Sequence, residues 1–189
     1  MRKKAAARPE VSARTSAGKK SPAKSGAPKV GASSSDPLLG KLAPDFTMAT
    51  DGGGGVTLSK LKGQPVVLYF YPKDNTSGCT AEACGFRDNL ARFNRANAVV
   101  IGISKDSPKS HDNFKAKQGL NFTLASDEDG KVCERYGVWI EKSLYGRRYM
   151  GIDRATFIVD AQGRIARAWR KVKVPGHVDE VLKAVQGLS

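Results

Sequence analysis

Two cysteines five residues apart, Cys79 and Cys84, are the residues of this chain best suited to chemistry. Cys79 follows the turn-forming pair Ser77-Gly78 and precedes a run, residues 80–93, in which apolar side chains recur at helical spacing. The Cys79 thiol is therefore expected in the first turn of a helix, where unpaired N–H groups and the helix dipole favour an anion. Because the thiolate is the nucleophilic form of cysteine, this position favours thiol chemistry.

The segment that delivers Cys79 is a short apolar run, Val66 to Tyr71. Its β-branched and aromatic residues stand between two prolines and predict a buried strand. Free cysteine also occurs as a small buried core residue, and this alternative applies here. The four residues between the cysteines differ from the Cys-x-x-Cys spacing of disulfide oxidoreductases. The pattern Pro-x-x-x-Thr-x-x-Cys, formed by Pro72, Thr76 and Cys79, favours a nucleophile.

This pattern resembles that of the peroxiredoxins, and specifically of the peroxiredoxin Q type, also called bacterioferritin comigratory protein. The resemblance runs from Pro37 to the C-terminus. The segments that carry it are 41–46, 70–88, 99–104, 132–139 and 154–160. It implies a thioredoxin-like α/β fold and the reduction of hydrogen peroxide or organic hydroperoxides with no metal or organic cofactor. The implied protein is an antioxidant enzyme, and it is most often a monomer.

The resemblance assigns Cys79 the role of peroxidatic cysteine, whose sulfur attacks the terminal peroxide oxygen and becomes a sulfenic acid. The Thr76 hydroxyl would link the thiolate and the peroxide by a hydrogen bond. Pro72 would shield the sulfur from water, since it has no N–H. The backbone N–H groups of Gly78 and Cys79 would point at the peroxide oxygens. Taken alone, Thr76 is equally typical of a turn or a helix cap.

Two charged residues complete the set that the resemblance implies. Arg154 would stabilise the thiolate and the charge that develops on the leaving oxygen. Glu82 matches an acidic position that orients an arginine. Taken alone, Arg154 is typical of an exposed arginine at the start of a strand, so the joint pattern with Cys79 carries the assignment.

Cys84 resembles the resolving cysteine of this group. Five residues of helix rise about 7.5 Å and turn by about 140°, which places the two Cα atoms roughly 8.6 Å apart. A disulfide tolerates at most about 7 Å. If Cys79 and Cys84 pair, the first turn of the helix must unwind, which would present the bridge to a reductant such as thioredoxin. Cys133, in a predicted helix at 129–136, is either a buried structural thiol or an alternative resolver.

The composition limits the class of protein. With 189 residues, 40% hydrophobic, the chain is long enough for one sizeable core, and no apolar run reaches the length of a membrane span. Three cysteines and no signal-peptide core favour a reducing compartment, the cytoplasm. His111 and His177 stand far apart without metal-ligand spacing, which argues against a zinc site. Both are expected on the surface.

The remaining elements predict a mixed central sheet covered by helices on both faces. Expected strands are 46–49, 56–58, 99–104, 122–125 and 155–159, with a hairpin turn at 160–163 leading into 164–170. Expected helices are 108–118, capped by Ser107, and 177–186, followed by Gly187. The four glycines 52–55 are expected to form a flexible turn, and no Gly-Lys-Ser/Thr follows that would make it a phosphate loop.

Residues 1–36 differ in kind from the domain expected over 37–189. The first 35 residues hold nine basic residues and the single acid Glu10, which gives +8 of the chain's net charge of +14. Such a segment, rich in Ala, Ser, Pro and Lys, is expected to be disordered. It is a solvated extension, an arm that binds DNA or RNA through phosphate contacts, or an organelle transit peptide.

Three functions therefore compete at the level of the whole chain. The first is a thiol peroxidase recycled by thioredoxin. The second is a nucleic-acid-associated protein with a protective or redox-sensing role, in which the peroxidase activity of the domain is lost or subordinate. The third is a disulfide reductase, which the missing Cys-x-x-Cys disfavours. The complete set of Pro72, Thr76, Cys79 and Arg154 favours the peroxidase.

Overall fold

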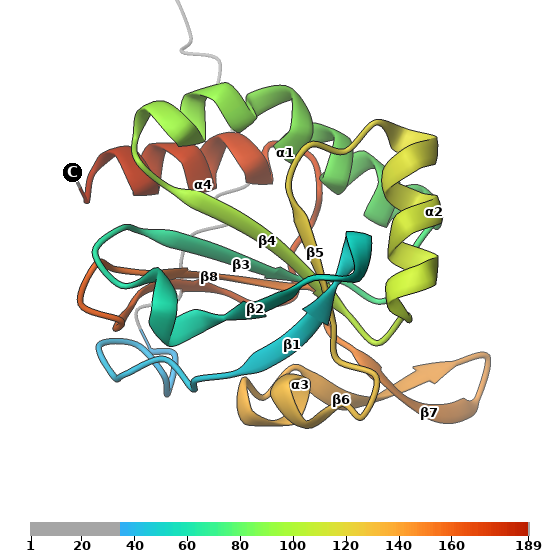
Figure 1. Ribbon diagram of the computed structural model, residues 1–189. Helices are drawn as coiled ribbons and strands as arrows, with labels where there is room; N and C mark the ends of the chain where they lie inside the picture. The colour runs from blue at the N-terminus through green and yellow to red at the C-terminus, as the bar shows by residue number, and fades with distance from the viewer. Residues whose placement is uncertain (1–34, 189) are drawn as a thin grey trace, which may run out of the picture.

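The computed structural model describes residues 35–188 and is built on a mixed seven-stranded sheet (Figure 1). Its strand order is β2-β1-β5-β4-β3-β8-β9. The strands are β1 (Thr47–Thr50), β2 (Gly55–Thr57), β3 (Val66–Phe70), β4 (Val99–Ser104), β5 (Thr123–Ser126), β8 (Ala155–Val159) and β9 (Ile165–Trp169). Strands β3, β4 and β5 run parallel to one another. On one side β8 pairs antiparallel with β3, and β9 antiparallel with β8. On the other side β1 pairs antiparallel with β5, and β2 antiparallel with β1.

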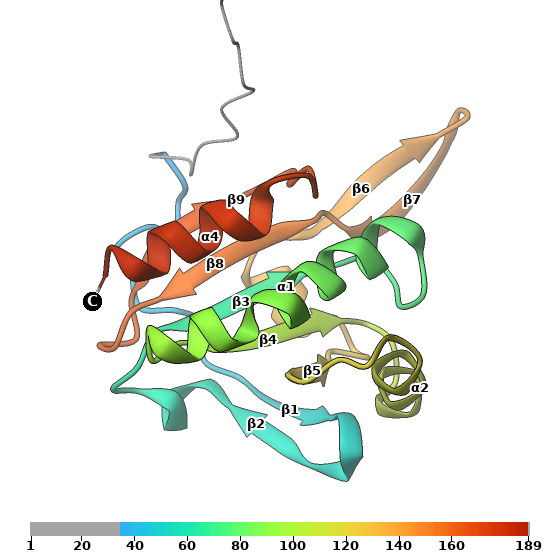
Figure 2. The ribbon, with the colours of Figure 1, turned by 90° about the horizontal axis from the view of Figure 1, so that it is seen from above.

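Four α-helices cover the sheet: α1 (Ser77–Arg95), α2 (Pro108–Gln118), α3 (Lys131–Arg135) and α4 (His177–Gln186). Helices α1 and α4 lie side by side on one face, with α2 beside β5, and α3 lies on the opposite face (Figures 1 and 2). A separate hairpin, β6 (Trp139–Leu144) and β7 (Arg147–Ile152), projects from the body. Short 3₁₀ turns occupy 51–53 and 58–61.

Strand β3 is buried along its whole length and divides the core in two. Because successive strand side chains point to opposite faces, Val67, Tyr69 and Tyr71 pack beneath α1 and α4. Leu68 and Phe70 point the other way, into the cluster that includes α3. Both halves of the core therefore fix the strand that leads to the cysteines.

The register around β3 decides which segments meet at its end. Phe70, the last residue of β3, pairs with Ile103 of the parallel β4 and with Ala155 of the antiparallel β8. The loop after β3, the loop after β4 and the beginning of β8 therefore lie together at one edge of the sheet. Residues far apart in sequence are brought to the start of α1 in this way.

The predicted architecture is confirmed: the sheet is mixed and helices cover both faces. The bounds of α2, α4, β4 and β8 agree with the sequence prediction, and α1 begins three residues earlier than expected. The β6–β7 hairpin was not expected. Part of the predicted glycine turn forms a 3₁₀ turn, in which the Gly52 amide donates to Asp112 at 2.7 Å.

The prediction that both histidines lie on the surface is wrong. His111 in α2 is fully buried and His177 in α4 is 1% exposed. The Nε2 atom of His177 lies 2.7 Å from the Thr156 hydroxyl oxygen, and burial together with the charge of Arg154 lowers the pKa of His177 to about 4. The predicted tail, residues 1–36, lies outside the described residues except for its last two.

Candidate active site

Cys79 is the third residue of α1 and is almost completely buried. The helix begins after Thr76, whose carbonyl accepts the first helical hydrogen bond from the Thr80 amide at 2.8 Å. The expected position of Cys79 in the first helical turn is thus confirmed. At this point the N–H groups of the first turn have no partner within the helix, so they favour a negative charge.

Arg154 is the residue that meets the sulfur. It immediately precedes β8, and the pairing of β8 with β3 places its side chain against the start of α1. Its Nη2 lies 3.2 Å from the Cys79 Sγ, to which it donates a hydrogen bond. A Cβ atom at Gly78 would stand 3.3 Å from the same Nη2, so glycine leaves room for the guanidinium.

Glu82 holds the other side of the guanidinium. Its carboxylate accepts a hydrogen bond from Arg154 Nη1, and the side chain is fully buried. Burial raises the pKa of Glu82 to about 7, although the positive charge of Arg154 acts in the opposite direction. The second carboxylate oxygen, Oε1, has no hydrogen-bond partner among the described residues. Glu82 therefore orients Arg154 toward Cys79 while carrying the cost of a buried acid.

Thr76 and Pro72 lie on the exposed loop between β3 and α1. The Thr76 hydroxyl donates to the carbonyl of Lys73 at 3.0 Å, which closes the loop on itself just before the helix. Pro72 follows the last residues of the buried strand. The structure brings Cys79, Gly78 and Arg154 into direct proximity. Thr76 lies three residues before Cys79, at the start of α1.

The other two cysteines occupy different environments. Cys84 follows Cys79 by five residues on α1 and is partly exposed, and all three cysteines are unpaired. Cys133 is fully buried in α3, where burial and the neighbouring Asp127 carboxylate raise the pKa of its thiol. The raised pKa disfavours the thiolate form of Cys133, as is typical of a buried structural thiol.

A group of polar residues beside this site was not predicted from the sequence. Asp74, in the loop that carries Thr76, is buried and contacts Tyr71, Ser110 and His111. The signal that could have found them is the parallel pairing of β3 with β4, which sets the start of α2 next to the loop after β3. In residues 35–188, no His, Cys, Asp or Glu side chains are grouped as a metal site. No helix in this part of the chain could cross a membrane.

Comparisons with known proteins agree with this geometry. Residues 39–168 match the AhpC/TSA family. A putative peroxiredoxin of Coxiella burnetii is 55% identical over 144 residues, which cover 76% of this chain and 95% of the relative. Peroxiredoxin Bcp of Bacillus subtilis is 48% identical over 151 residues, covering 80% and 96%.

Solved structures give the same picture. The structure of the Xanthomonas campestris bacterioferritin comigratory protein, described for its alkyl peroxide reduction activity, superposes with a TM-score of 0.72. It is 46% identical and the match covers 75% of this chain and 90% of that chain. A cysteine-to-serine mutant of Xylella fastidiosa peroxiredoxin Q superposes with a TM-score of 0.75 at 43% identity, covering 79% and 95%.

The chain therefore belongs to the AhpC/TSA family and, within it, to the peroxiredoxins of the Q, or bacterioferritin comigratory, type. The expected thioredoxin-like fold is confirmed by these structural matches. The expected class of activity, a thiol peroxidase, is confirmed with it.

Proposed function

We propose that this peroxiredoxin reduces hydrogen peroxide and organic hydroperoxides through Cys79, resolves the product with Cys84 and is recycled by a thioredoxin-like dithiol. The observation that carries the proposal is the contact between the buried Cys79 sulfur and Arg154 Nη2, 3.2 Å apart at the start of α1. A permanent positive charge and unpaired helical N–H groups meet at one sulfur, which is the environment that a nucleophilic thiolate requires.

In the first step the Cys79 thiolate attacks the terminal oxygen of the hydroperoxide. A sulfur–oxygen bond forms, the oxygen–oxygen bond breaks, and the leaving alkoxide or hydroxide takes up a proton. Cysteine is oxidised to sulfenic acid and the peroxide is reduced to an alcohol or to water. Arg154 supports both the thiolate and the leaving oxygen, and the N–H groups of Gly78 and Cys79 orient the peroxide. Pro72 and Thr76 line the approach from the exposed loop.

In the second step the Cys84 thiol attacks the Cys79 sulfenic acid, and a disulfide and one water molecule form. Both residues belong to one helix in the reduced protein, and helical geometry keeps their Cα atoms roughly 8.6 Å apart. The bridge therefore requires the start of α1 to unwind. Support for Cys84 over Cys133 comes from exposure: Cys84 is partly exposed in the segment that must unwind, whereas Cys133 is buried and resists ionisation.

Peroxide consumption by the purified protein tests this function, with thioredoxin, thioredoxin reductase and NADPH as one reductant and dithiothreitol as another. Cys79→Ser is expected to abolish turnover with both, and Cys133→Ser to retain most of it. Mass spectrometry of peroxide-treated protein should find a bridge between Cys79 and Cys84, and Cys84→Ser should accumulate sulfenic acid and overoxidise more readily. A dominant bridge from Cys79 to Cys133 would make Cys133 the resolver.

The basic segment supports one additional role. The +8 net charge of residues 1–35 favours non-specific binding to nucleic acid, which would place the peroxidase close to DNA or RNA. The rest of the protein is proposed to act as a monomer in the cytoplasm. Salt-dependent retention on immobilised DNA tests the binding of nucleic acid by residues 1–35. Sedimentation of the reduced protein tests its monomeric state.

A further inference from the structure

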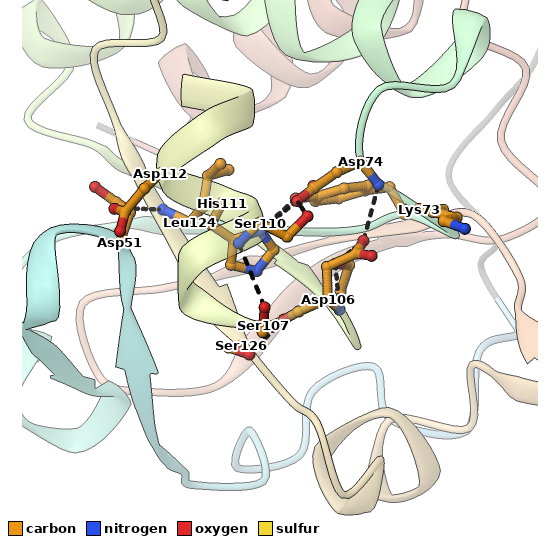
Figure 3. Close-up of polar contacts among 12 residues, drawn as sticks. Asp51, Lys73, Asp74, Asp106, Ser107, Ser110, His111, Asp112, Leu124 and Ser126 are labelled. Atoms are coloured by element: carbon orange, nitrogen blue, oxygen red, sulfur yellow. Dashed lines mark hydrogen bonds and ion pairs between the residues drawn. The ribbon is translucent and has the colours of Figure 1, made fainter. Parts of the chain in front are cut away.

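A buried polar cluster adjoins the loop that leads to Cys79 (Figure 3). At its centre is Asp74, 5% exposed, which accepts three hydrogen bonds from the rest of the protein. They come from the hydroxyl of Tyr71 at 2.7 Å, the hydroxyl of Ser110 at 2.8 Å and Nδ1 of His111 at 2.9 Å. The Asp74 backbone amide also donates to Asp106 Oδ2 at 2.8 Å. The loop is thus tied to α2 and to the segment before it.

The sheet explains why these residues meet. Parallel β3 and β4 end side by side, so the loop after β3 lies against the loop after β4 and the first turn of α2. The Ser104 hydroxyl donates to Asp106 Oδ2 at 2.8 Å and holds the acceptor used by the Asp74 amide. In Figure 3 the side chains of Ser110 and His111 point from α2 toward Asp74.

The His111 ring faces two residues of this cluster: its Nδ1 lies 2.9 Å from Asp74 Oδ2 and 3.4 Å from the Tyr71 hydroxyl oxygen. His111 is fully buried, and its Nε2 has no hydrogen-bond partner among the described residues. Burial tends to raise the pKa of Asp74, but hydrogen bonds from His111 and Tyr71 outweigh it and the pKa lies below its usual value. Asp74 is therefore an ionised acceptor, and Nδ1 of His111 must carry the proton that it donates. Among the described residues, the imidazole ring has polar contacts to Asp74 and Tyr71, so it acts as an anchor for the loop that follows β3.

The anchored loop is short and already strained. Asn75, next to Asp74, adopts φ of 59°, in the left-handed region that asparagine tolerates better than most residues. Thr76 follows directly and is the residue from which α1 starts. Pro72 lies two residues before Asp74. Because these residues are consecutive or nearly so, a shift of Asp74 would also move Pro72, Thr76 and the start of α1.

We propose that His111 and Tyr71 are positioning residues of the peroxidase: by holding Asp74 they set Pro72, Thr76 and the first N–H groups of α1 for attack by Cys79. The proposal rests on the proposed function. The hydrogen bond to the Cys79 sulfur comes from Arg154, whereas the polar contacts of His111 and Tyr71 go to Asp74. The two effects can therefore be separated by mutation. Arg154 stabilises the Cys79 thiolate, and the contacts of Asp74 position the groups that orient the peroxide.

Substitutions that keep or remove the donor test this proposal. In His111→Asn the amide nitrogen can take the place of Nδ1 and donate to Asp74, whereas His111→Leu fills similar space without a donor. Tyr71→Phe removes only one hydroxyl. Its matched control is Tyr136→Phe, because the Tyr136 hydroxyl donates to the Pro44 carbonyl at 2.9 Å on the other face of the sheet.

Two rate constants are measured for each reduced variant, at a temperature where it is folded. One is the reaction of Cys79 with hydrogen peroxide in a single turnover, and the other is its alkylation by iodoacetamide. We expect His111→Leu to lower the peroxide constant by about tenfold or more, since misplaced groups cost rate steeply. Its alkylation constant should not fall, because Arg154 is untouched. His111→Asn should recover most of the peroxide constant, Tyr71→Phe should lower it less than His111→Leu, and Tyr136→Phe should leave it unchanged.

Three results would overturn the proposal. The first is a rate constant of His111→Leu with peroxide within about twofold of the parent's. The second is an equal fall of the peroxide and alkylation rate constants in His111→Leu. The third is a rate constant of His111→Asn with peroxide as low as that of His111→Leu. If His111→Leu does not fold, Tyr71→Phe against Tyr136→Phe decides. If the parent protein itself does not react with peroxide, the proposed function fails. Amide hydrogen exchange then tests the anchor alone: Tyr71→Phe should speed exchange of residues 73–78 and not of α4, and unchanged exchange there refutes it.

Discussion

A substitution at Ala81 tests whether the start of α1 must unwind for Cys79 and Cys84 to pair. Ala81 lies between the two cysteines, within α1, and its side chain is exposed. Ala81→Gly therefore removes helix propensity without removing a buried contact. Glycine in a helix interior costs about 0.9 kcal/mol relative to alanine, which is about a fivefold change in an equilibrium constant.

The expected effect follows from the different needs of the two steps. Attack on peroxide uses the folded helix, which stays the dominant form, so its rate constant should be unchanged. Disulfide formation uses the unwound form, whose population rises about fivefold, so resolution should accelerate by about the same factor. The sulfenic acid then has less time to react again. The fraction of Cys79 overoxidised per turnover should fall about fivefold.

Rapid quenching of the reduced protein after one equivalent of peroxide, followed by mass spectrometry, gives the amounts of sulfenic acid and disulfide with time. The same measurement with excess peroxide gives the sulfinic acid, which needs a second peroxide. Ala91→Gly is the matched control, because Ala91 is also exposed and lies in the same helix but beyond the two cysteines. It should leave both rates near those of the parent. Equal acceleration by the two substitutions, or no acceleration by Ala81→Gly, would refute unwinding confined to the start of α1.

Three further predictions concern other parts of the chain. Burial raises the pKa of Glu82 from 4.5 to about 7, so the folded protein holds this proton more tightly than the unfolded chain does. The stability that results is fully present below about pH 4.5 and is lost as the pH rises toward 7. Urea unfolding between about pH 5 and 8 should therefore show a smaller decline for Glu82→Gln than for the parent, and the exposed Glu134→Gln should behave like the parent. Cys133→Ser should lower the free energy of unfolding, since it puts a hydroxyl into a fully buried site, while peroxide turnover below the melting temperature changes little. Deletion of residues 1–35 should leave turnover nearly unchanged and sharply weaken binding to duplex DNA at low salt. A full-length protein without salt-dependent retention on DNA would refute the nucleic-acid role.

The regular elements could be predicted where local chemistry marks their ends. Helix α2 starts at Pro108 after Ser107, whose hydroxyl accepts from the Ser110 amide at 3.3 Å, and it ends at Gly119 with φ of 61°. Both signals are readable in sequence. The β6–β7 hairpin has no such mark. Its turn residues Tyr145 and Gly146 have φ of 49° and 76°, and tyrosine is rare in a turn that normally takes asparagine or aspartate.

The site was predictable only in part. The family resemblance identified Cys79 and Arg154, which are 75 positions apart, but no local pattern shows that they touch. That contact depends on the antiparallel pairing of β3 with β8. From the sequence, His111 was expected on the surface. The structure turns a narrow face made by His111 and Phe114 inward, and both are fully buried.

The anchors on either side of the cysteines determine how far unwinding can spread. On one side Asp74 is tied to α2, and on the other Phe86 is fully buried and stacks on Tyr69 with ring centroids 4.6 Å apart. Both cysteines lie between these two points. Unwinding that spreads past either anchor would expose core side chains at a cost of about 1.5–3 kcal/mol each. Unwinding between them releases the Arg154 contacts and the buried carboxylate of Glu82, and of the core it exposes only the small side chains of Cys79 and Ala83. This segment is therefore the part of α1 that can change while the sheet persists.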